Sequence, residues 1–189
     1  AASFGLDFPL DGLLEDDFSL APFDLASAYA ILAAEGLQTG QNIPLLDDLT
    51  GASLPGALPE GQGLEPAAVL QVMYADGSPW LDWSVPERRS VVTPQLAYLL
   101  THVLSDEAAR WPSLGNPNPL EIGRPAAVKA ARTLDEAGAW TVGYTPQRVI
   151  VVYLSGAGLG SGAASDGLWS AITRVAVQDL PATGWEIPA

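Results

Sequence analysis

Cysteine is absent from these 189 residues, and histidine occurs once, as His102. The first absence excludes disulfides, cysteine nucleophiles and thiolate metal sites, and the second excludes a metal site built on two histidines. Basic residues are also scarce, with 8 against 22 acidic ones, which gives a net charge of −14. Because nucleic acids and anionic lipid surfaces are bound mainly through Lys and Arg, neither is expected as a partner.

Long apolar runs are missing too, since no stretch approaches the ~18 residues that a membrane-spanning helix needs. Acidic residues interrupt the apolar ones near the start of the sequence, so no signal peptide is expected there, and any targeting segment would lie outside this sequence. Hydrophobic residues nevertheless make up 48% of the chain. This content is enough for a core, and the length suits one domain or part of a larger one.

The first third of the chain predicts one helix, a long loop and a hairpin. Pro22 suits the first turn of a helix through residues 24–34, with Gly36 at its C-terminal end. Residues 37–66 are rich in glycine and proline and predict a loop with no clear element. Two short strands, 69–74 and 80–83, are expected around Asp76-Gly77, which is a strong turn signal.

The clearest helix is expected after Thr93, which suits the N-cap, with Pro94 at the first helical position. It is expected to end near Arg110. An apolar stripe at helical spacing is expected to face the core; it consists of Leu96, Leu99, Leu100, Val103 and Leu104.

The last third predicts three strands, 126–132, 139–144 and 148–154, followed by a glycine-rich loop and a helix near 166–177. Clustered strands with helices packed on them indicate an α+β fold with an antiparallel sheet. We therefore expect a single partial domain in three parts: 1–66 with a helix and long loops, 67–124 with a hairpin, a long helix and a loop, and 125–189 with a three-stranded sheet and a C-terminal helix.

Four segments of this sequence resemble one family, in the family's own order and over nearly the whole chain. PFDLASAYAILAAEG resembles the helix after the second active-site motif of penicillin-binding transpeptidases. VVTPQLAYLLTHVLSDEAARWPSLG is similar to the long helix and loop of their bifunctional class A type, and SDGLWSAI to the last helix. RPAAVKAARTLDEAGAWTVGYTPQRVIVVYLSG is similar to the three strands of the catalytic sheet. The resemblance implies the C-terminal portion of a penicillin-binding transpeptidase/β-lactamase-like fold.

The family's activity is that of a serine D,D-transpeptidase, which uses a Ser-x-x-Lys, a Ser-x-Asn and a Lys-Thr-Gly motif. Lys129 is the lone lysine here, and neither of the first two motifs occurs in the sequence. In the family both motifs precede the segment that this chain resembles. The third motif has become Lys129-Ala130-Ala131, which lacks the substrate-binding hydroxyl and the glycine that allows close approach.

The resemblance thus gives five vestigial substrate-cleft positions and no intact catalytic residue: Lys129, Ala130, Ala131, Arg132 and Thr133. It also places Gly138 where the family has an aspartate. No cofactor and no metal ion is expected.

Three functions remain open. The first is a catalytically inactive transpeptidase-like module, acting as an extracytoplasmic structural or interaction subunit of a bacterial cell envelope, with another protein chain as its partner. The second is the C-terminal fragment of an active D,D-transpeptidase, which would bind wall peptide or β-lactam only if the missing motifs lie upstream. The third is a binding module for wall peptides or glycan around Lys129 and Arg132.

Other candidates receive simpler interpretations. The glycines at 156–162 do not have the spacing of a phosphate-binding loop. His102 is expected at the surface, and the acidic groups 15–17 and 47–48 are expected in solvated loops in preference to a cation site. Of the six tryptophans, Trp140 and Trp169 match core positions of the family, whereas Trp80, Trp83 and Trp111 could form an interaction surface.

Overall fold

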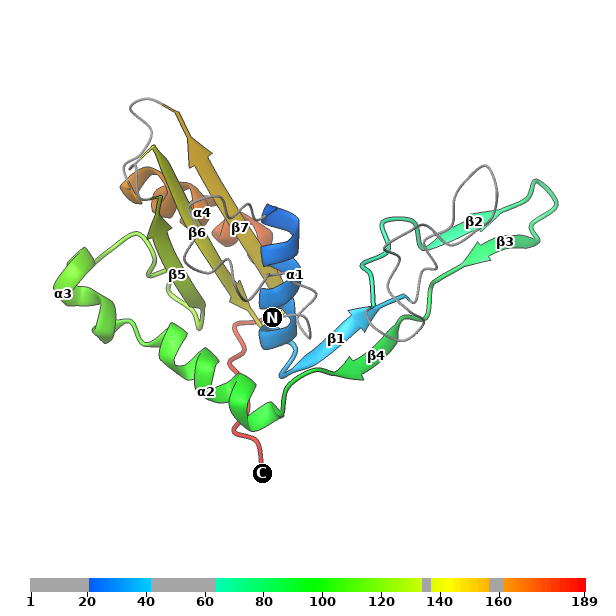
Figure 1. The fold of residues 1–189 in the computed structure, drawn as a ribbon, viewed down its shortest axis with the longest axis horizontal. Helices are drawn as coiled ribbons and strands as arrows, with labels where there is room; N and C mark the ends of the chain where they lie inside the picture. Colours follow the sequence, from blue (N-terminus) through cyan, green and yellow to red (C-terminus); the bar gives the residue numbers. More distant parts are fainter. Residues whose placement is uncertain (1–20, 42–63, 134–136, 157–161) are drawn as a thin grey trace, which may run out of the picture.

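The computed structural model describes residues 21–41, 64–133, 137–156 and 162–189 (Figure 1). Helices and strands mix along these ranges, which confirms the predicted α+β class. The elements are, in chain order, α1 (Pro22–Ala33), β1 (Leu37–Gly40), β2 (Gln71–Met73), β3 (Pro79–Asp82), β4 (Glu87–Ser90), α2 (Pro94–Ser105), η3 (Ala108–Arg110), α3 (Trp111–Leu114), β5 (Ala127–Arg132), β6 (Gly138–Thr145), β7 (Arg148–Ser155) and α4 (Gly162–Ala176).

The main sheet is antiparallel and has the order β5-β6-β7, as the sequence predicts. The pairing register has no shift between neighbouring strands, so each row across the sheet holds one residue from each of the three strands. Helices α1 and α2 pack on one face of this sheet, and α4 packs on the other (Figure 1). Strand β6 is central, while β5 and β7 form the edges.

Each face of the sheet has its own core. On the α4 side, fully buried Trp169 packs with Val128 and Val152, and its indole N–H donates to the carbonyl of Ile150 at 3.1 Å. The indole lies so close to the sheet that a Cβ at position 143 would be 2.4 Å from Trp169 Cζ2, so the central strand needs Gly143 here.

The core on the other face joins α1 and α2 to the sheet. Leu32 of α1 and Ala97 of α2 pack there against Ala127 and Tyr144. The prediction for α1 is confirmed: Pro22 is its first residue, and Gly36 follows its end with φ of 93°. The Gly36 N–H donates to the carbonyl of Ile31 at 2.8 Å, which satisfies one of the last helical carbonyls.

Helix α2 starts as predicted but ends earlier. The Thr93 hydroxyl accepts a hydrogen bond from the Leu96 N–H, and Pro94 is the first helical residue. The chain becomes extended at Asp106, whose carboxylate instead accepts from the Ala109 N–H at 3.1 Å. Asp106 thereby stops α2 at Ser105 and starts the separate turn η3, so the predicted single helix to Arg110 is wrong.

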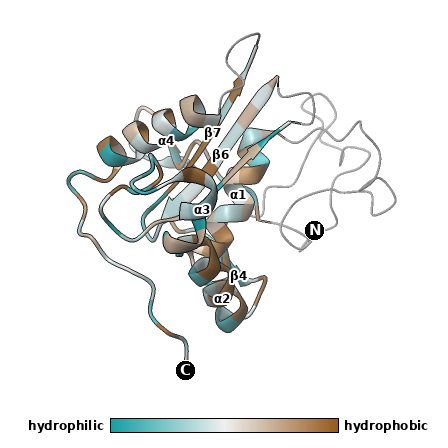
Figure 2. Cartoon of the chain, turned by 90° about the vertical axis from the view of Figure 1, so that its left-hand side faces the viewer, coloured by the Kyte–Doolittle hydropathy of each residue, from teal (hydrophilic) through white to brown (hydrophobic). Residues whose placement is uncertain are grey.

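The predicted orientation of α2 is wrong as well. Its buried residues are Ala97 and Thr101, whereas Leu99 and Val103 of the predicted core stripe are 60% and 69% exposed. Small residues face the sheet because they let the helix approach it closely. Most of the large apolar residues of α2 therefore remain exposed on its outer side, and much of this helix has hydrophobic colouring in Figure 2; we call Leu96, Leu99, Leu100 and Val103 the outer stripe.

Two narrow ribbons extend away from the sheet (Figure 1). Strand β1 pairs with β4. The sequence predicts a loop where β1 lies and makes no prediction for β4, so neither strand was expected. Beyond them, β2 pairs with β3 around the Asp76-Gly77 turn, which confirms the predicted hairpin with shorter strands. Buried Gln41 joins the ribbons, since its side-chain amide donates to the carbonyls of Trp83 and Val85 at 3.0 and 3.1 Å. We call residues 65–86 the arm.

Among the described elements the longest helix is α4, with 15 residues. No helix within these ranges has the length and apolar character needed to cross a membrane.

Candidate functional site

Strand β5 carries the residues that the sequence singles out, and its pairing shows which of them share a face. Lys129 lies in one row with Val142 and Val151, and Ala131 lies in the next row with Trp140 and Tyr153. Side chains alternate along a strand, so these rows share the face on which α1 and α2 pack. Lys129 and Ala131 are both exposed on this face.

Arg132 belongs to the opposite face. Its guanidinium lies at the start of α4, because a Cβ built on Gly162 would be 3.0 Å from Arg132 Nε. Burial raises the pKa of the Asp166 carboxyl there, and both a hydrogen bond from Thr141 and the charge of Arg132 oppose that shift. Lys129 and Arg132 therefore lie on opposite faces of β5 and do not form one cationic patch.

The remaining predicted positions are Ala130, Ala131 and Thr133, and none of them presents a free hydroxyl beside Lys129. Ala130 packs against the core beneath Trp169, and Ala131 places a methyl group beside Trp140. The Thr133 hydroxyl belongs to the β5–β6 turn, where it accepts from the Gly138 N–H at 2.8 Å and lies 3.2 Å from the Gly138 carbonyl oxygen. The assignment of residues 129–133 as vestigial substrate-cleft positions stays a prediction.

A groove of about 250 Å³ runs between the outer edge of β5 and the segment from α2 to α3. Val128, Lys129 and Ala130 line it from the strand, and Arg110 and Asp106 line it from the other side. Strand β5 has no further strand on this edge within the described ranges. The groove is the place where an extended ligand could lie along β5.

Arg110 is a residue of this groove that the sequence did not reveal. One of its Nη atoms donates to the carbonyl of Leu104 at 2.8 Å, whereas Nε and the other Nη are shielded from solvent and have no acceptor in the described part of the chain. Burial lowers the pKa of Arg110, and nearby Glu107, Glu121 and Asp106 counteract this. Because the sequence predicts a longer helix that ends at Arg110, it gave no indication that Arg110 lines this groove.

Trp140 and Tyr153 form an aromatic pair at the end of the same face. Their ring centroids are 4.3 Å apart with an interplanar angle of 29°. The Tyr153 ring also crosses the neighbouring strand, since a Cβ at Gly138 would lie 3.0 Å from both Tyr153 Cε2 and its hydroxyl oxygen. The pair thus fills the space above Gly138, where the resemblance expects an aspartate.

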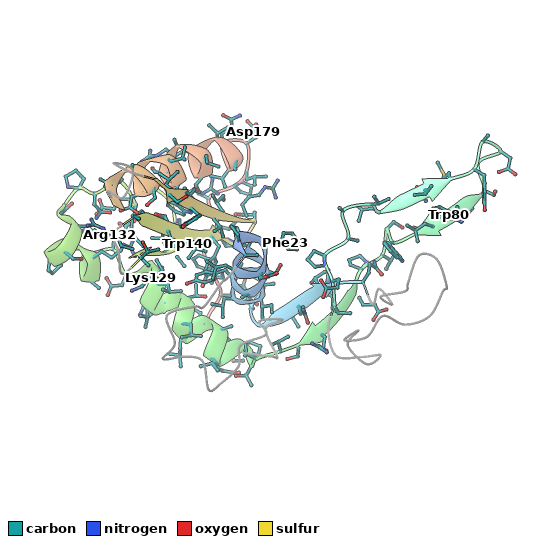
Figure 3. All side chains as sticks on the ribbon, turned by 45° about the horizontal axis from the view of Figure 1, so that its top comes forward. Phe23, Trp80, Lys129, Arg132, Trp140 and Asp179 are labelled. Carbon is teal, nitrogen blue, oxygen red and sulfur yellow. The ribbon has the colours of Figure 1, made fainter. Side chains whose placement is uncertain are left out.

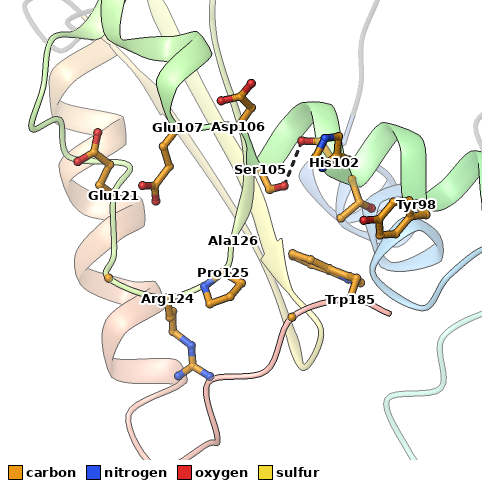
Figure 4. Close-up of a pocket in the computed structure, with 13 residues that line it drawn as sticks. Tyr98, His102, Ser105, Asp106, Glu107, Glu121, Arg124, Pro125, Ala126 and Trp185 are labelled. Carbon is orange, nitrogen blue, oxygen red and sulfur yellow. Dashed lines mark hydrogen bonds between the residues drawn. The ribbon is translucent and has the colours of Figure 1, made fainter. Parts of the chain in front are cut away.

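A wider pocket of about 930 Å³ lies on the other side of α2 (Figure 4). Tyr98 and His102 stack along its wall with centroids 6.0 Å apart, and Glu107, Glu121 and Trp185 also line it. Arg124 points away from these carboxylates toward the C-terminal segment, where it donates to the carbonyls of Val177, Leu180 and Pro181. His102 is exposed at the pocket rim, as the sequence predicts.

Several sequence candidates lie outside the described residues, namely both acidic groups, 15–17 and 47–48, and most of the glycine-rich loop. Within the described ranges no three His, Asp or Glu side chains gather in a way that could hold a metal ion.

Comparison with known proteins shows similarity in structure alone. The sequence matches no protein-family model and no curated protein. The structure is similar to the penicillin-binding protein PonA1 from Mycobacterium tuberculosis, with a TM-score of 0.65 and 22% identity over 96% of this chain and 44% of that one. It is also similar to penicillin-binding protein 1A from Haemophilus influenzae, with a TM-score of 0.58 and 17% identity over 98% of this chain and 31% of that one. The chain spans less than half the length of either protein.

Proposed function

With the fold of penicillin-binding proteins as the premise, we propose that the chain is a transpeptidase-like module without D,D-transpeptidase activity. It acts outside the cytoplasmic membrane as a structural or interaction subunit. The observation that carries this proposal is the loss of polar side chains around Lys129 on β5: Lys129 is exposed on one face of the strand, while the side chains next to it in sequence point to the other face or have no polar atoms.

The chemistry of the third motif supports the loss of activity. Binding of a carboxylate needs hydrogen-bond donors that converge on it. Ala130 and Ala131 offer no side-chain donor, the Thr133 hydroxyl is held in the β5–β6 turn, and Arg132 lies on the other face. Among the residues of the altered motif on this face of β5, Lys129 is left as a single flexible charge, and such a charge does not fix the geometry of a substrate.

The exposed surfaces support the interaction role. The outer stripe of α2 is apolar and exposed, and β7 is a hydrophobic edge strand with which no further strand pairs in the described part of the chain. Soluble proteins rarely leave a hydrophobic helix face and an unpaired hydrophobic strand together in water. Another polypeptide segment covers them in this proposal, either from a longer form of this chain or from a partner protein.

The alternative is the C-terminal fragment of an active D,D-transpeptidase, whose Ser-x-x-Lys and Ser-x-Asn motifs lie upstream. The observation that favours it is coverage, since the chain matches only 44% and 31% of the two similar structures. In that case the altered third motif still predicts slow acylation, for the reasons above.

The test is reaction of the protein, purified from its native source without denaturant, with a fluorescent penicillin. Intact mass and N-terminal sequencing of the same sample define which polypeptides are present. We expect no covalent adduct on any of them. A stoichiometric penicilloyl adduct on an upstream serine would overturn the proposal and establish the alternative.

A restoring variant separates the two possibilities further. Ala130→Thr with Ala131→Gly rebuilds the third motif, and Ala171→Thr on the exposed side of α4 is the matched control. If upstream motifs exist, the double variant increases the acylation rate and the control does not. If the module has lost its activity entirely, neither variant reacts.

A further inference from the structure

The arm carries an apolar surface that no other described element covers. Its large apolar side chains, on both strands and on the residues next to them, are exposed to solvent; they are Val69, Leu70, Met73, Tyr74, Trp80 and Val85. A two-stranded hairpin has no core of its own and is only marginally stable alone. A surface of this composition resembles the anchor region of a protein interface, where aromatic residues and methionine are enriched.

Trp80 is presented by an irregularity of the hairpin. Val72 pairs with Leu81 while the next residue, Met73, pairs with Pro79, so Trp80 is an extra residue in β3. Such a bulge changes the direction of a side chain relative to a regular strand. Trp80 is 67% exposed and lies on the arm, far from Lys129 and the sheet (Figure 3).

Two carboxylates flank this tryptophan in the sequence, and local hydrogen bonds hold each of them. Asp76 accepts hydrogen bonds from the N–H and hydroxyl of Ser78 at 2.9 and 2.6 Å, and Asp82 accepts the same pair from Ser84 at 3.0 and 2.6 Å. The hydrogen bonds from the serine side chains hold the pKa of both carboxyls below its usual range, so both are ionised at neutral pH. No Lys, Arg or His occurs in residues 65–86 to neutralise them.

We propose that the arm docks onto a partner protein through an apolar pocket rimmed by Lys or Arg, with Trp80 in the pocket and Asp76 and Asp82 paired to the rim. This inference rests on the proposed interaction role and names its surface and its partner chemistry. Charge complementarity decides the occupant. Anionic membrane surfaces repel the two carboxylates, and a symmetric pairing of two arms would bring like charges together.

Photo-crosslinking in the native cells tests the contact. Benzoylphenylalanine replaces Trp80 in one variant and Val175 in a second, because Val175 is equally exposed on α4. We expect a protein adduct from position 80 and none from position 175, and mass spectrometry should locate it in a segment with apolar and basic residues. An adduct with lipid, with a second copy or with another region of the same polypeptide overturns the proposal, as does the absence of any adduct.

Binding of the purified partner then measures the anchor. We expect Trp80→Ala to raise the dissociation constant at least tenfold. Asp82→Asn should raise it severalfold and make binding less dependent on salt concentration. Asn keeps an oxygen that can accept from Ser84, and Trp80 is exposed, so both variants are expected to fold, which circular dichroism checks. Unchanged affinity in Trp80→Ala overturns the proposal. Reaction with penicillin does not involve Trp80, so the two proposals fail separately.

Discussion

The hydroxyl groups of Thr101 and Tyr144 lie 2.8 Å apart between α2 and β6, and both residues are almost completely buried. The Tyr144 ring also makes edge contacts with Tyr29 and Trp185, at centroid distances of 5.9 and 5.5 Å. This one side chain therefore connects α1, α2, the central strand and the C-terminal segment.

Removal of the Thr101 hydroxyl should destabilise the protein. Thr101→Val keeps the shape but leaves the Tyr144 hydroxyl buried without its partner, so the free energy of unfolding should fall by about 1–3 kcal/mol. Urea denaturation measures it, with Thr39→Val on exposed β1 as the control. The double variant Thr101→Val/Tyr144→Phe should recover part of the loss, and strictly additive losses would contradict the coupling.

Alkaline pH should destabilise the protein through Tyr144. Burial raises the pKa of Tyr144 from 10.0 to about 12, an effect that the hydrogen bond with Thr101 partly offsets. Between these values the unfolded state loses the phenol proton while the folded state keeps it, so stability is full below pH 10 and decreases above it. The slope should approach ~1.4 kcal/mol per pH unit. Tyr144→Phe should flatten it in urea titrations from pH 9 to 11. An equal slope in that variant would assign the effect to other groups, such as Tyr29, whose pKa burial also raises.

Loss of the charge on Asp166 should be tolerated. Burial raises the pKa of this carboxyl, so the folded state disfavours the ionised form, and stability falls as pH rises from the unfolded value through the folded one. Asp166→Asn keeps an acceptor for the Thr141 hydroxyl, which lies 2.7 Å away. Thermal unfolding should show the variant at least as stable as the parent at pH 7, whereas Asp166→Ala should lose ~1–2 kcal/mol. Exposed Asp179→Asn is the control, and a large loss in Asp166→Asn would mean that the charge pair with Arg132 dominates.

A methyl group at position 143 should disrupt the α4 core. Gly143→Ala would place Cβ 2.4 Å from Trp169 Cζ2 and 2.8 Å from the carbonyl oxygen of Ala127. Neither the buried indole nor the strand can move without loosening the sheet, so we expect a loss of ~1–3 kcal/mol or more and a changed near-ultraviolet signal from Trp169. Gly167→Ala, where the added methyl meets nothing, is the comparison. Equal stability of the two variants would show that α4 shifts freely.

Local signals in the sequence predicted much of the fold, since the Thr93-Pro94 helix start, the Asp76-Gly77 turn and the three consecutive strands all lie where they were expected. The orientation of α2 was not predictable in this way. Hydrophobic periodicity selects the most apolar face, but close packing on the sheet required the small residues Ala97 and Thr101. Strands β1 and β4 were not predicted because Leu37–Gly40 and Glu87–Ser90 show no alternation of apolar and polar residues.

The candidate site was only partly accessible from the sequence. A spacing of three residues on a strand already places Lys129 and Arg132 on opposite faces, whereas Arg110 enters the groove only because Asp106 interrupts the helix. That interruption depends on a side-chain hydrogen bond, which residue patterns do not reveal.

Gly138 and Tyr153 also constrain how this sequence can change over time. A Cβ at position 138 would lie 3.0 Å from the tyrosine ring and from its hydroxyl oxygen, so a side chain there requires the Tyr153 ring to shift. Such a shift, or a smaller residue at position 153, would disturb the stacking of Tyr153 with Trp140. A larger residue at position 138 is therefore coupled to a rearrangement at position 153, and we expect these two positions to change together.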